Sequence, residues 1–296
     1  MLTVSGLTRR FGETLALDDV RFEVAPGRLT GFVGANGAGK TTTMRIILGV
    51  LAPHAGEVRW NGTPLTRATR RSFGYMPEER GLYPKMKIRD QLVFFGKLHG
   101  LDPDAAAERV DKLLDRLGLA ERAGDMLETL SLGNQQRVQI AAALVHEPVA
   151  LVLDEPFSGL DPFAVDAMAD LLREEVGSHV PVLFSSHQLE LVERLCDDLV
   201  VLSHGKVVAA GAVDELRGNG RRTTVYRVVL DSDAGWLRDV AGLTVKDVDG
   251  CSAQIDVGEP GREQELLRAA LERGPVRELT PVRPALSDVF REATSR

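Results

Sequence analysis

The sequence predicts an α/β protein whose residues 1–217 form a mostly parallel sheet, followed by a small α+β domain. Short apolar runs of strand length, such as TGFVG, ALVLDEP and PVLFSSH, alternate with longer segments of helical periodicity. Such alternation indicates a parallel sheet with its functional residues at the carboxyl edge. The stretch GNGRR, at residues 218–222, predicts a linker, and the pattern changes after it.

The N-terminal half begins with about thirty residues that alternate apolar and polar side chains and predict short antiparallel strands. TGFVG predicts a buried strand, and a glycine-rich loop and a helix ending near Pro53 follow it. Two helical patterns, IRDQLVFFGKLHG and DAAAERVDKLLDRLGL, predict a helical insertion at about residues 85–134. One face of the second helix collects its apolar side chains, which are Val110, Leu113, Leu114 and Leu117.

The α/β pattern resumes at Ser131. Helices are predicted for LGNQQRVQIAAALVH, PFAVDAMADLLREEV and QLELVERLC, and buried parallel strands for ALVLDEP and PVLFSSH. LVVLSHGKVVAAG predicts a hairpin that turns at His204 and Gly205.

The tail, residues 223–296, predicts an accessory C-terminal domain. Its segments follow the order strand, helix, strand, strand, helix, strand, which is the ferredoxin-like βαββαβ arrangement. A last helix is expected from Pro284. Since the tail contains no evident catalytic constellation, we expect it to widen a dimer interface; the alternative is a domain that binds a partner or ligand.

The amino-acid composition argues against several classes of function. The 296 residues are 44% apolar and 27% charged, as in a folded soluble protein, and the net charge of −7 offers no basic field for nucleic acid. Cys196 and Cys251 fit no metal or redox spacing and are expected to be buried, reduced thiols of a cytosolic protein. The sequence predicts no signal peptide and no apolar run near the roughly 18 residues that span a bilayer. If the protein serves a membrane, another chain must supply the span.

A phosphate-binding loop is predicted at residues 34–41, GANGAGKT, which match G-x-x-x-x-G-K-[ST] between a strand and a helix. Glycines let the backbone N–H groups curl around phosphates, while Lys40 reaches the β- and γ-phosphates and Thr41 ligates Mg²⁺. An incidental glycine turn would produce this pattern in about one such chain per hundred. The other predicted nucleotide contacts are Gly34, Asn36, Gly37, Ala38, Gly39 and Thr42. We therefore expect a P-loop (RecA-like) ATPase core.

A pair of carboxylates follows the buried strand in ALVLDEP. Asp154 is in the position from which a P-loop protein holds Mg²⁺, and Glu155 is placed to accept a proton from the attacking water. The alternative is a merely polar strand end. The phosphate loop upstream favours the catalytic interpretation.

The segment LSLGNQQR, residues 130–137, resembles the LSGGQ signature of ABC-type ATPases. Leu132 replaces the first glycine of that signature and Asn134 its glutamine, while Ser131 and Gly133 remain. A serine at a helix start can cap the helix and bind an anion, although a plain helix cap would look the same. The position one helix before the DE strand favours the signature.

Further motifs resemble that family in the same order. Asp161 ends SGLD, which resembles the loop that touches the opposite protomer, and His187 ends SSH and resembles the switch histidine that contacts the γ-phosphate. Phe11 resembles the aromatic residue that stacks on adenine, although an apolar residue there can also belong to the core. A lone histidine is more often structural, but this one follows a buried strand as the family requires.

Two adjacent carboxylates, Glu78 and Glu79, lie in SFGYMPEERGLYP. YMPE resembles the family's Tyr-x-x-Gln segment, whose glutamine reaches Mg²⁺ and the attacking water. Glu78 occupies the glutamine position, and a carboxylate is a competent ligand for a hard cation. The resemblance therefore implies that Glu78 is a catalytic and metal-binding residue, directly or through water, and that Glu79 is a solvated neighbour.

The resemblance implies that two such subunits bind ATP and Mg²⁺ between them, with Ser131 and Gly133 acting across the interface. PEERGLYP, LSLGNQQ and RPALSDVF resemble ATP-binding subunits of bacterial drug, antibiotic and sodium exporters. The implied partners are a separately encoded integral membrane permease and a second ATP-binding subunit, at the cytoplasmic face of the cell membrane, and no nucleic acid. The alternatives are a soluble ABC-type ATPase acting on ribosomes or DNA, and a regulatory or resistance ATPase without a permease.

Overall fold

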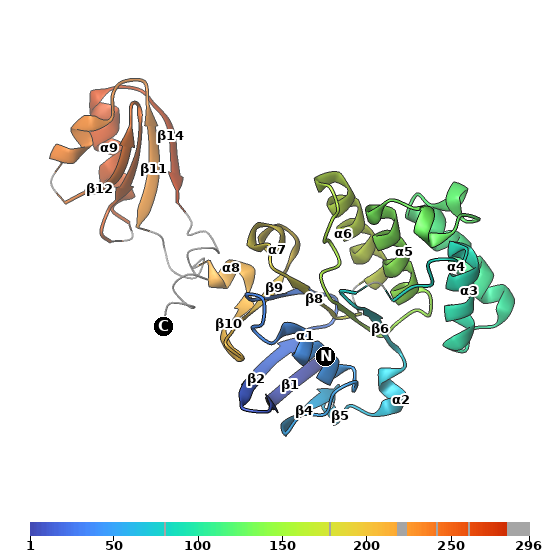
Figure 1. The fold of residues 1–296 in the computed structure, drawn as a ribbon. Coiled ribbons are helices and arrows are strands. Elements are labelled where there is room, and N and C mark those ends of the chain that lie inside the picture. Colours follow the sequence, from blue (N-terminus) through green and yellow to red (C-terminus); the bar gives the residue numbers. More distant parts are fainter. Residues whose placement is uncertain (80, 178, 218–223, 241, 260, 283–296) are drawn as a thin grey trace. The chain divides into compact units, whose positions relative to one another are not determined.

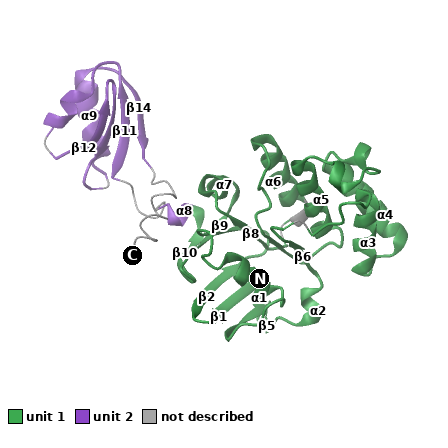
Figure 2. Cartoon of the chain, viewed as in Figure 1, with its two compact units in different colours: residues 1–213, 296 green, residues 214–295 purple. Residues whose placement is uncertain are grey.

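The computed structural model describes residues 1–296 except 80, 178, 218–223, 241, 260 and 283–296 (Figure 1). The chain divides into two compact units, Met1–Val213 and Asp214–Ser295 (Figure 2). The domain limits drawn from the sequence, at 217 and 223, stay a prediction. The helix expected from Pro284 lies outside the described residues.

The first unit contains an antiparallel sheet with the strand order β2-β1-β4-β5. Its strands alternate buried apolar and exposed polar residues because only one face of the sheet is covered. The four strands are β1 (Leu2–Phe11), β2 (Thr14–Val24), β4 (Ala55–Trp60) and β5 (Thr63–Pro64). The sequence pattern predicted antiparallel pairing for the first two.

The central sheet has the order β10-β9-β3-β8-β7-β6. Five strands are parallel, and β10 (Lys206–Ala212) pairs antiparallel with β9 through a turn at His204 and Gly205, which have φ of 48° and 77°. The parallel strands are β3 (Leu29–Val33), β6 (Phe73–Met76), β7 (Ala150–Leu153), β8 (Val182–Ser186) and β9 (Asp198–Ser203). The predicted hairpin and the mostly parallel sheet are therefore confirmed.

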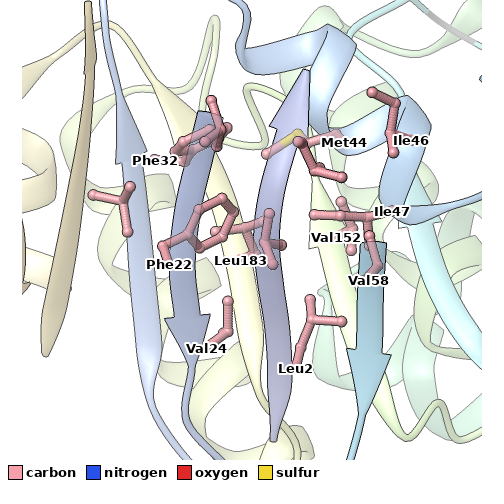
Figure 3. Close-up of a cluster of buried hydrophobic side chains, with 14 of the residues drawn as sticks. Leu2, Phe22, Val24, Phe32, Met44, Ile46, Ile47, Val58, Val152 and Leu183 are labelled. Carbon is pink, nitrogen blue, oxygen red and sulfur yellow. The ribbon is translucent and has the colours of Figure 1, made fainter. Parts of the chain in front are cut away.

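A single apolar cluster joins the two sheets to α1 (Lys40–Ile47), as Figure 3 shows. Phe22 of β2 packs on Phe32 of β3 with ring centroids 5.2 Å apart, and Met44 and Ile47 of α1 are fully buried in the same cluster (Figure 3). Because α1 follows the glycine-rich loop directly, this packing fixes the position of the loop.

The helical insertion predicted between the α/β halves is present. Its helices are α3 (Ile88–Leu98) and α4 (Pro103–Arg116), with short 3₁₀ turns at Ala120–Arg122 and Leu127–Thr129 before α5 (Leu132–Leu144). Asp102 caps α4 by accepting a hydrogen bond from the N–H of Asp104. The predicted apolar face is buried: the exposed fractions of Val110, Leu113, Leu114 and Leu117 are 0%, 0%, 1% and 5%.

The remaining helices of the first unit lie between its strands along the chain. They are α2 (Arg67–Arg70), α6 (Pro162–Val176) and α7 (Leu189–Leu195). The short helix α8 (Val213–Leu216) follows β10 and begins at the last residue of this unit. In the described residues, no helix combines the length and apolar character needed to cross a membrane.

The second unit has the predicted ferredoxin-like topology. Its four antiparallel strands have the order β12-β13-β11-β14, and Val228, Ile255 and Leu266 are fully buried in its core. The elements are β11 (Val225–Leu230), η3 (Gly235–Asp239), β12 (Thr244–Asp249), β13 (Ser252–Asp256), α9 (Glu263–Arg273) and β14 (Val276–Pro281). The first expected helix is a 3₁₀ helix of 5 residues, the tighter form that proteins use in short pieces. Cys251 is exposed and not buried as the sequence predicted, because it lies in the turn between β12 and β13.

Candidate active site

A pocket of about 250 Å³ lies at the carboxyl ends of β3 and β7. It brings together residues that the sequence singled out separately: the phosphate loop, Glu78, Asp154 and Glu155. Its complete lining is Ala16, Asn36, Gly37, Gly39, Lys40, Thr41, Thr42, Glu78, Asp154 and Glu155. This is the sheet edge at which α/β proteins bind their ligands.

The loop has the backbone that phosphate binding requires. Gly39, the N-cap of α1, has a φ of 108°, which only glycine adopts readily. A Cβ atom at Gly34 would lie 2.4 Å from the carbonyl oxygen of Leu202, so a side chain is excluded there. The Nζ atom of Lys40 donates to the carbonyl oxygen of Gly34 at 2.7 Å and so lies over the loop. The free N–H groups at the start of α1 and the lysine charge together favour an anion.

Asp154 is 1% exposed and has one oxygen without a partner. Its Oδ1 accepts a hydrogen bond from Ser185 Oγ at 2.5 Å, whereas Oδ2 is buried and accepts none. An unpartnered buried carboxylate oxygen beside a phosphate loop is suited to a cation, since it is costly without one.

The donor set fits Mg²⁺. Thr41, Glu78 and Asp154 line the pocket and offer only oxygen atoms, which hard cations prefer. In the described part of the chain, no three His, Cys, Asp or Glu side chains are close enough to hold a metal by themselves. Mg²⁺ normally completes its shell with phosphate and water oxygens, so one or two carboxylates suffice.

Glu155 and His187 are in contact, as a general base and its partner would be. The Nδ1 atom of His187 lies 3.0 Å from Oε2 of Glu155. The side chain of His187 is 53% exposed and that of Glu155 only 12%. Glu155 is therefore largely buried at the sheet edge, and His187 already orients one oxygen of its carboxylate.

Of the two adjacent carboxylates after β6, Glu78 lines the pocket. Both side chains are exposed. The placement of Glu78 agrees with a role near the phosphates, and its metal contact stays a prediction.

Seven predicted site residues do not line this pocket: Phe11, Gly34, Ala38, Ser131, Gly133, Asp161 and His187. Gly34 and Ala38 belong to the phosphate loop itself, and His187 contacts Glu155. Ser131 caps α5 by accepting from the N–H of Asn134 at 3.4 Å, and Asp161 caps α6 by accepting from that of Ala164 at 2.9 Å. A Cβ atom at Gly133 would lie 3.3 Å from Leu160 Cδ2, so the first turn of α5 lies beside the loop that precedes α6. Within one chain, neither segment lines the phosphate pocket.

Phe11 is exposed rather than part of the core. The residue is 48% exposed, and the guanidinium carbon of Arg9 lies 4.9 Å from the centroid of its ring. An exposed aromatic ring is available for stacking, but its role towards adenine stays a prediction.

The sequence interpretation missed two buried polar side chains that contact the backbone of Glu155. Ser185 Oγ accepts a hydrogen bond from the N–H of Glu155 at 2.8 Å, and Gln136 Nε2 donates to the carbonyl oxygen of Glu155 at 3.1 Å. Ser185 lies two residues before His187 in a buried strand, and a polar residue in such a strand needs a partner. The polar character of Ser185 within a buried strand was the one signal in the sequence that could have identified it.

A second pocket, of about 190 Å³, lies between the segment after β6 and helices α3 and α5. Gln139 of α5 is 4% exposed and lines it, and neither its Nε2 nor its Oε1 has a hydrogen-bond partner. Burial, and next the charge of Asp154, raise the pKa of Tyr75, which also lines this pocket. The other lining residues are Pro77, Gly81, Leu82, Phe95, His99 and Ala142.

Two family profiles match the chain. One, described as ABC transporter, matches residues 17–158, and the other, the C-terminal domain of DrrA1-3-like ATP-binding proteins, matches residues 211–294. The chain is 37% identical to the ABC transporter ATP-binding protein YhaQ of Bacillus subtilis, across 99% of this chain and 98% of YhaQ. It is 36% identical to the Nod factor export ATP-binding protein I of Burkholderia lata, across 97% and 95%.

A solved structure described as an ATP-binding subunit of an ABC transporter matches the fold with a TM-score of 0.68 at 34% identity. The match covers 74% of this chain and 93% of that one. The chain belongs to the ABC transporter ATP-binding proteins, a family that binds and hydrolyses ATP and works with membrane permeases. The predicted family, P-loop fold and ATPase activity are confirmed.

Proposed function

We propose that this subunit uses ATP and Mg²⁺ to drive a separately encoded membrane permease that exports drugs, antibiotics, ions or lipids. The observation that carries the proposal is the pocket in which the phosphate loop meets Glu78, Asp154 and Glu155. The whole-length similarity to a Nod factor export protein supports the direction of transport.

Within one subunit, the phosphate loop and Lys40 bind the phosphates of ATP, while Thr41, Glu78 and Asp154 hold Mg²⁺. When bound, Mg²⁺ neutralises charge that develops on the transferred phosphoryl group. Glu155 orients or deprotonates the attacking water, and His187 orients the carboxylate and contacts the γ-phosphate. Catalysis then rests on positioning and charge stabilisation.

A second copy of the chain completes the site. Ser131, Gly133 and Asp161 of one subunit contact the nucleotide held by the phosphate loop of the other. Their position outside the pocket of their own chain supports this arrangement. Ser131 and Asp161 are exposed, as residues that act across an interface must be in a separate chain.

The helical insertion is the proposed docking site for the permease. Phe94 and Leu98 of α3 have exposed fractions of 44% and 69%, and Tyr83, just before the insertion, has one of 53%. Tyr83 and Phe94 contact Phe95, which lines the second pocket together with the unpaired Gln139. An amphipathic helix of the permease would cover the apolar group and offer Gln139 a polar partner. The subunit is then peripheral, at the cytoplasmic face of the membrane.

The catalytic half of the proposal is tested with Glu155→Gln. The expected variant binds ATP with unchanged affinity, hydrolyses it at least about 100-fold more slowly and elutes as an ATP-stabilised dimer in light-scattering chromatography. Hydrolysis at the wild-type rate would remove Glu155 from its role.

The docking half is tested with Leu98→Asp, since a charge on the covered surface opposes binding of an apolar partner. The expected variant keeps its nucleotide affinity and loses most of its recovery with membranes. Val50→Asp is the matched control, because Val50 is 72% exposed in the same unit and lies outside the insertion. Equal recovery of both variants would contradict the proposed docking site.

The alternative is a soluble ATPase of the same family acting on ribosomes or DNA. The net charge of −7 does not favour it, and neither does the similarity to an export protein.

A further inference from the structure

Glu155 has an unusual backbone conformation for its residue type. Its φ is 51°, in the left-handed region that residues with a side chain seldom adopt. Such a conformation persists only where the surroundings hold it, and it is common at active sites. The groups that hold the backbone of Glu155 are therefore part of how its carboxylate is aimed.

The N–H group of Glu155 is held by Ser185, a fully buried residue of β8. Ser185 Oγ accepts from this N–H at 2.8 Å and donates to Oδ1 of Asp154 at 2.5 Å. One hydroxyl thus joins both acidic residues, with its donor and an acceptor position in use.

The carbonyl group of Glu155 is held by Gln136 of α5, which is 8% exposed. Gln136 Nε2 donates to the carbonyl oxygen of Glu155 at 3.1 Å and to that of Pro156 at 2.9 Å, so both amide hydrogens are in use. The N–H of Ser158 also donates to the carbonyl oxygen of Glu155, at 3.1 Å. The N–H group and the carbonyl group of Glu155 are therefore both held by buried side chains.

Gln136 lies on the helix that Ser131 caps. Five residues of α-helix span about 7.5 Å, so a displacement of the cap is transmitted rigidly to Gln136. In the proposed function Ser131 contacts the nucleotide of the opposite subunit. A change in that contact would therefore displace α5.

We propose that Ser185 and Gln136 are positioning residues for ATP hydrolysis. Both fix the strained backbone of Glu155, and Gln136 also links the position of Glu155 to that of α5, the helix that Ser131 caps. Neither lines the phosphate pocket. Both act through Glu155, so this inference rests on the proposed function.

The test compares Ser185→Ala and Gln136→Met with matched controls in the full-length chain. Ser186→Ala removes a hydroxyl that is 2% exposed on the same strand and accepts from the N–H of Gln188 instead. Gln135→Met removes an amide that is 9% exposed on the same helix and donates to the carbonyl oxygen of Leu130. Ser185→Ala and Gln136→Met are expected to lower kcat by about 10- to 100-fold with the Kd for ATP within about threefold, because misplacement of a catalytic group by about 1 Å has such an effect.

Retained ATP affinity shows that each variant is folded. Gln136→Met leaves the contacts of Asp154 intact, so its loss of kcat cannot come from metal binding. If kcat is unchanged in both variants, or falls equally in Ser186→Ala and Gln135→Met, the inference is wrong.

A double-variant cycle separates positioning from an independent role. In the Glu155→Gln background, Ser185→Ala is expected to cause no further loss of kcat, because the group it positions is already inactive. A further loss of the same factor would overturn the inference. If Glu155→Gln alone keeps the wild-type rate, the proposed function fails; if only Ser185→Ala and Gln136→Met keep it, the inference alone fails.

Discussion

The Nδ1 atom of His187 lies 3.0 Å from Oε2 of Glu155, although 32 residues separate them along the chain. The two residues follow the neighbouring parallel strands β8 and β7. The contact orients the carboxylate that faces the phosphate loop.

We expect His187→Ala to lower kcat for ATP hydrolysis by about 10- to 100-fold while ATP still binds, since a partner that orients a general base acts mainly in the transition state. Steady-state hydrolysis and equilibrium binding of ATP measure the two effects. An equal loss of affinity and kcat would indicate a role in binding instead.

Lys40→Ala is expected to weaken ATP binding by at least about 10-fold, because a charge-assisted contact with phosphate is among the stronger hydrogen bonds. Fluorescence titration with a labelled nucleotide measures it. Lys206→Ala is the control, since Lys206 pairs with Asp18 at 3.0 Å and does not line the pocket. Unchanged affinity in Lys40→Ala would contradict the phosphate-loop assignment.

The pair Glu78 and Glu79 offers an internal comparison. Glu78→Gln removes a charge from the pocket and is expected to retain ATP binding while changing hydrolysis or its coupling to transport. Glu79→Gln, one residue further on, is expected to change neither. Hydrolysis at several Mg²⁺ concentrations separates the two variants. If affinity, hydrolysis and transport are all unaltered in Glu78→Gln, the ligand assignment is wrong.

Acid is expected to destabilise the first unit through His146. Burial, and next the neighbouring His99, lower the pKa of His146 from 6.5 to about 4. Its ring stacks on His99 at 3.8 Å and its Nε2 lies 3.2 Å from the carbonyl oxygen of Phe73, which matches a neutral ring with a hydrogen on Nε2.

The unfolded chain therefore takes up this proton first, and stability falls as the pH drops from about 6.5 to about 4. Because the ring is only partly buried, we expect the loss to be about 1–2 kcal/mol. Urea denaturation at pH 7.5 and pH 5 measures it, and His146→Phe should remove this part of the pH dependence. If His146→Phe loses as much stability as the wild type between pH 7.5 and pH 5, other groups cause the loss.

Much of the site was predictable because its parts are local in sequence. The phosphate loop is one continuous motif, and the carboxylates follow an apolar strand whose ending is visible in ALVLDEP. Ser185 and Gln136 were not predictable, since their contacts with Glu155 depend on how β8 and α5 pack against β7. The 3₁₀ form of Gly235–Asp239 was missed for a related reason, as helical periodicity does not distinguish the two forms over 5 residues.

The central claim is that the subunit drives a membrane permease. Its most direct test is to isolate tagged Glu155→Gln from detergent-solubilised cells with ATP and Mg²⁺ and to identify co-purifying proteins by mass spectrometry. A stoichiometric polytopic membrane protein is the expected result and would also identify the chain that selects the cargo. Recovery of ribosomes or DNA-associated proteins without a membrane protein would contradict the claim and favour a soluble ATPase.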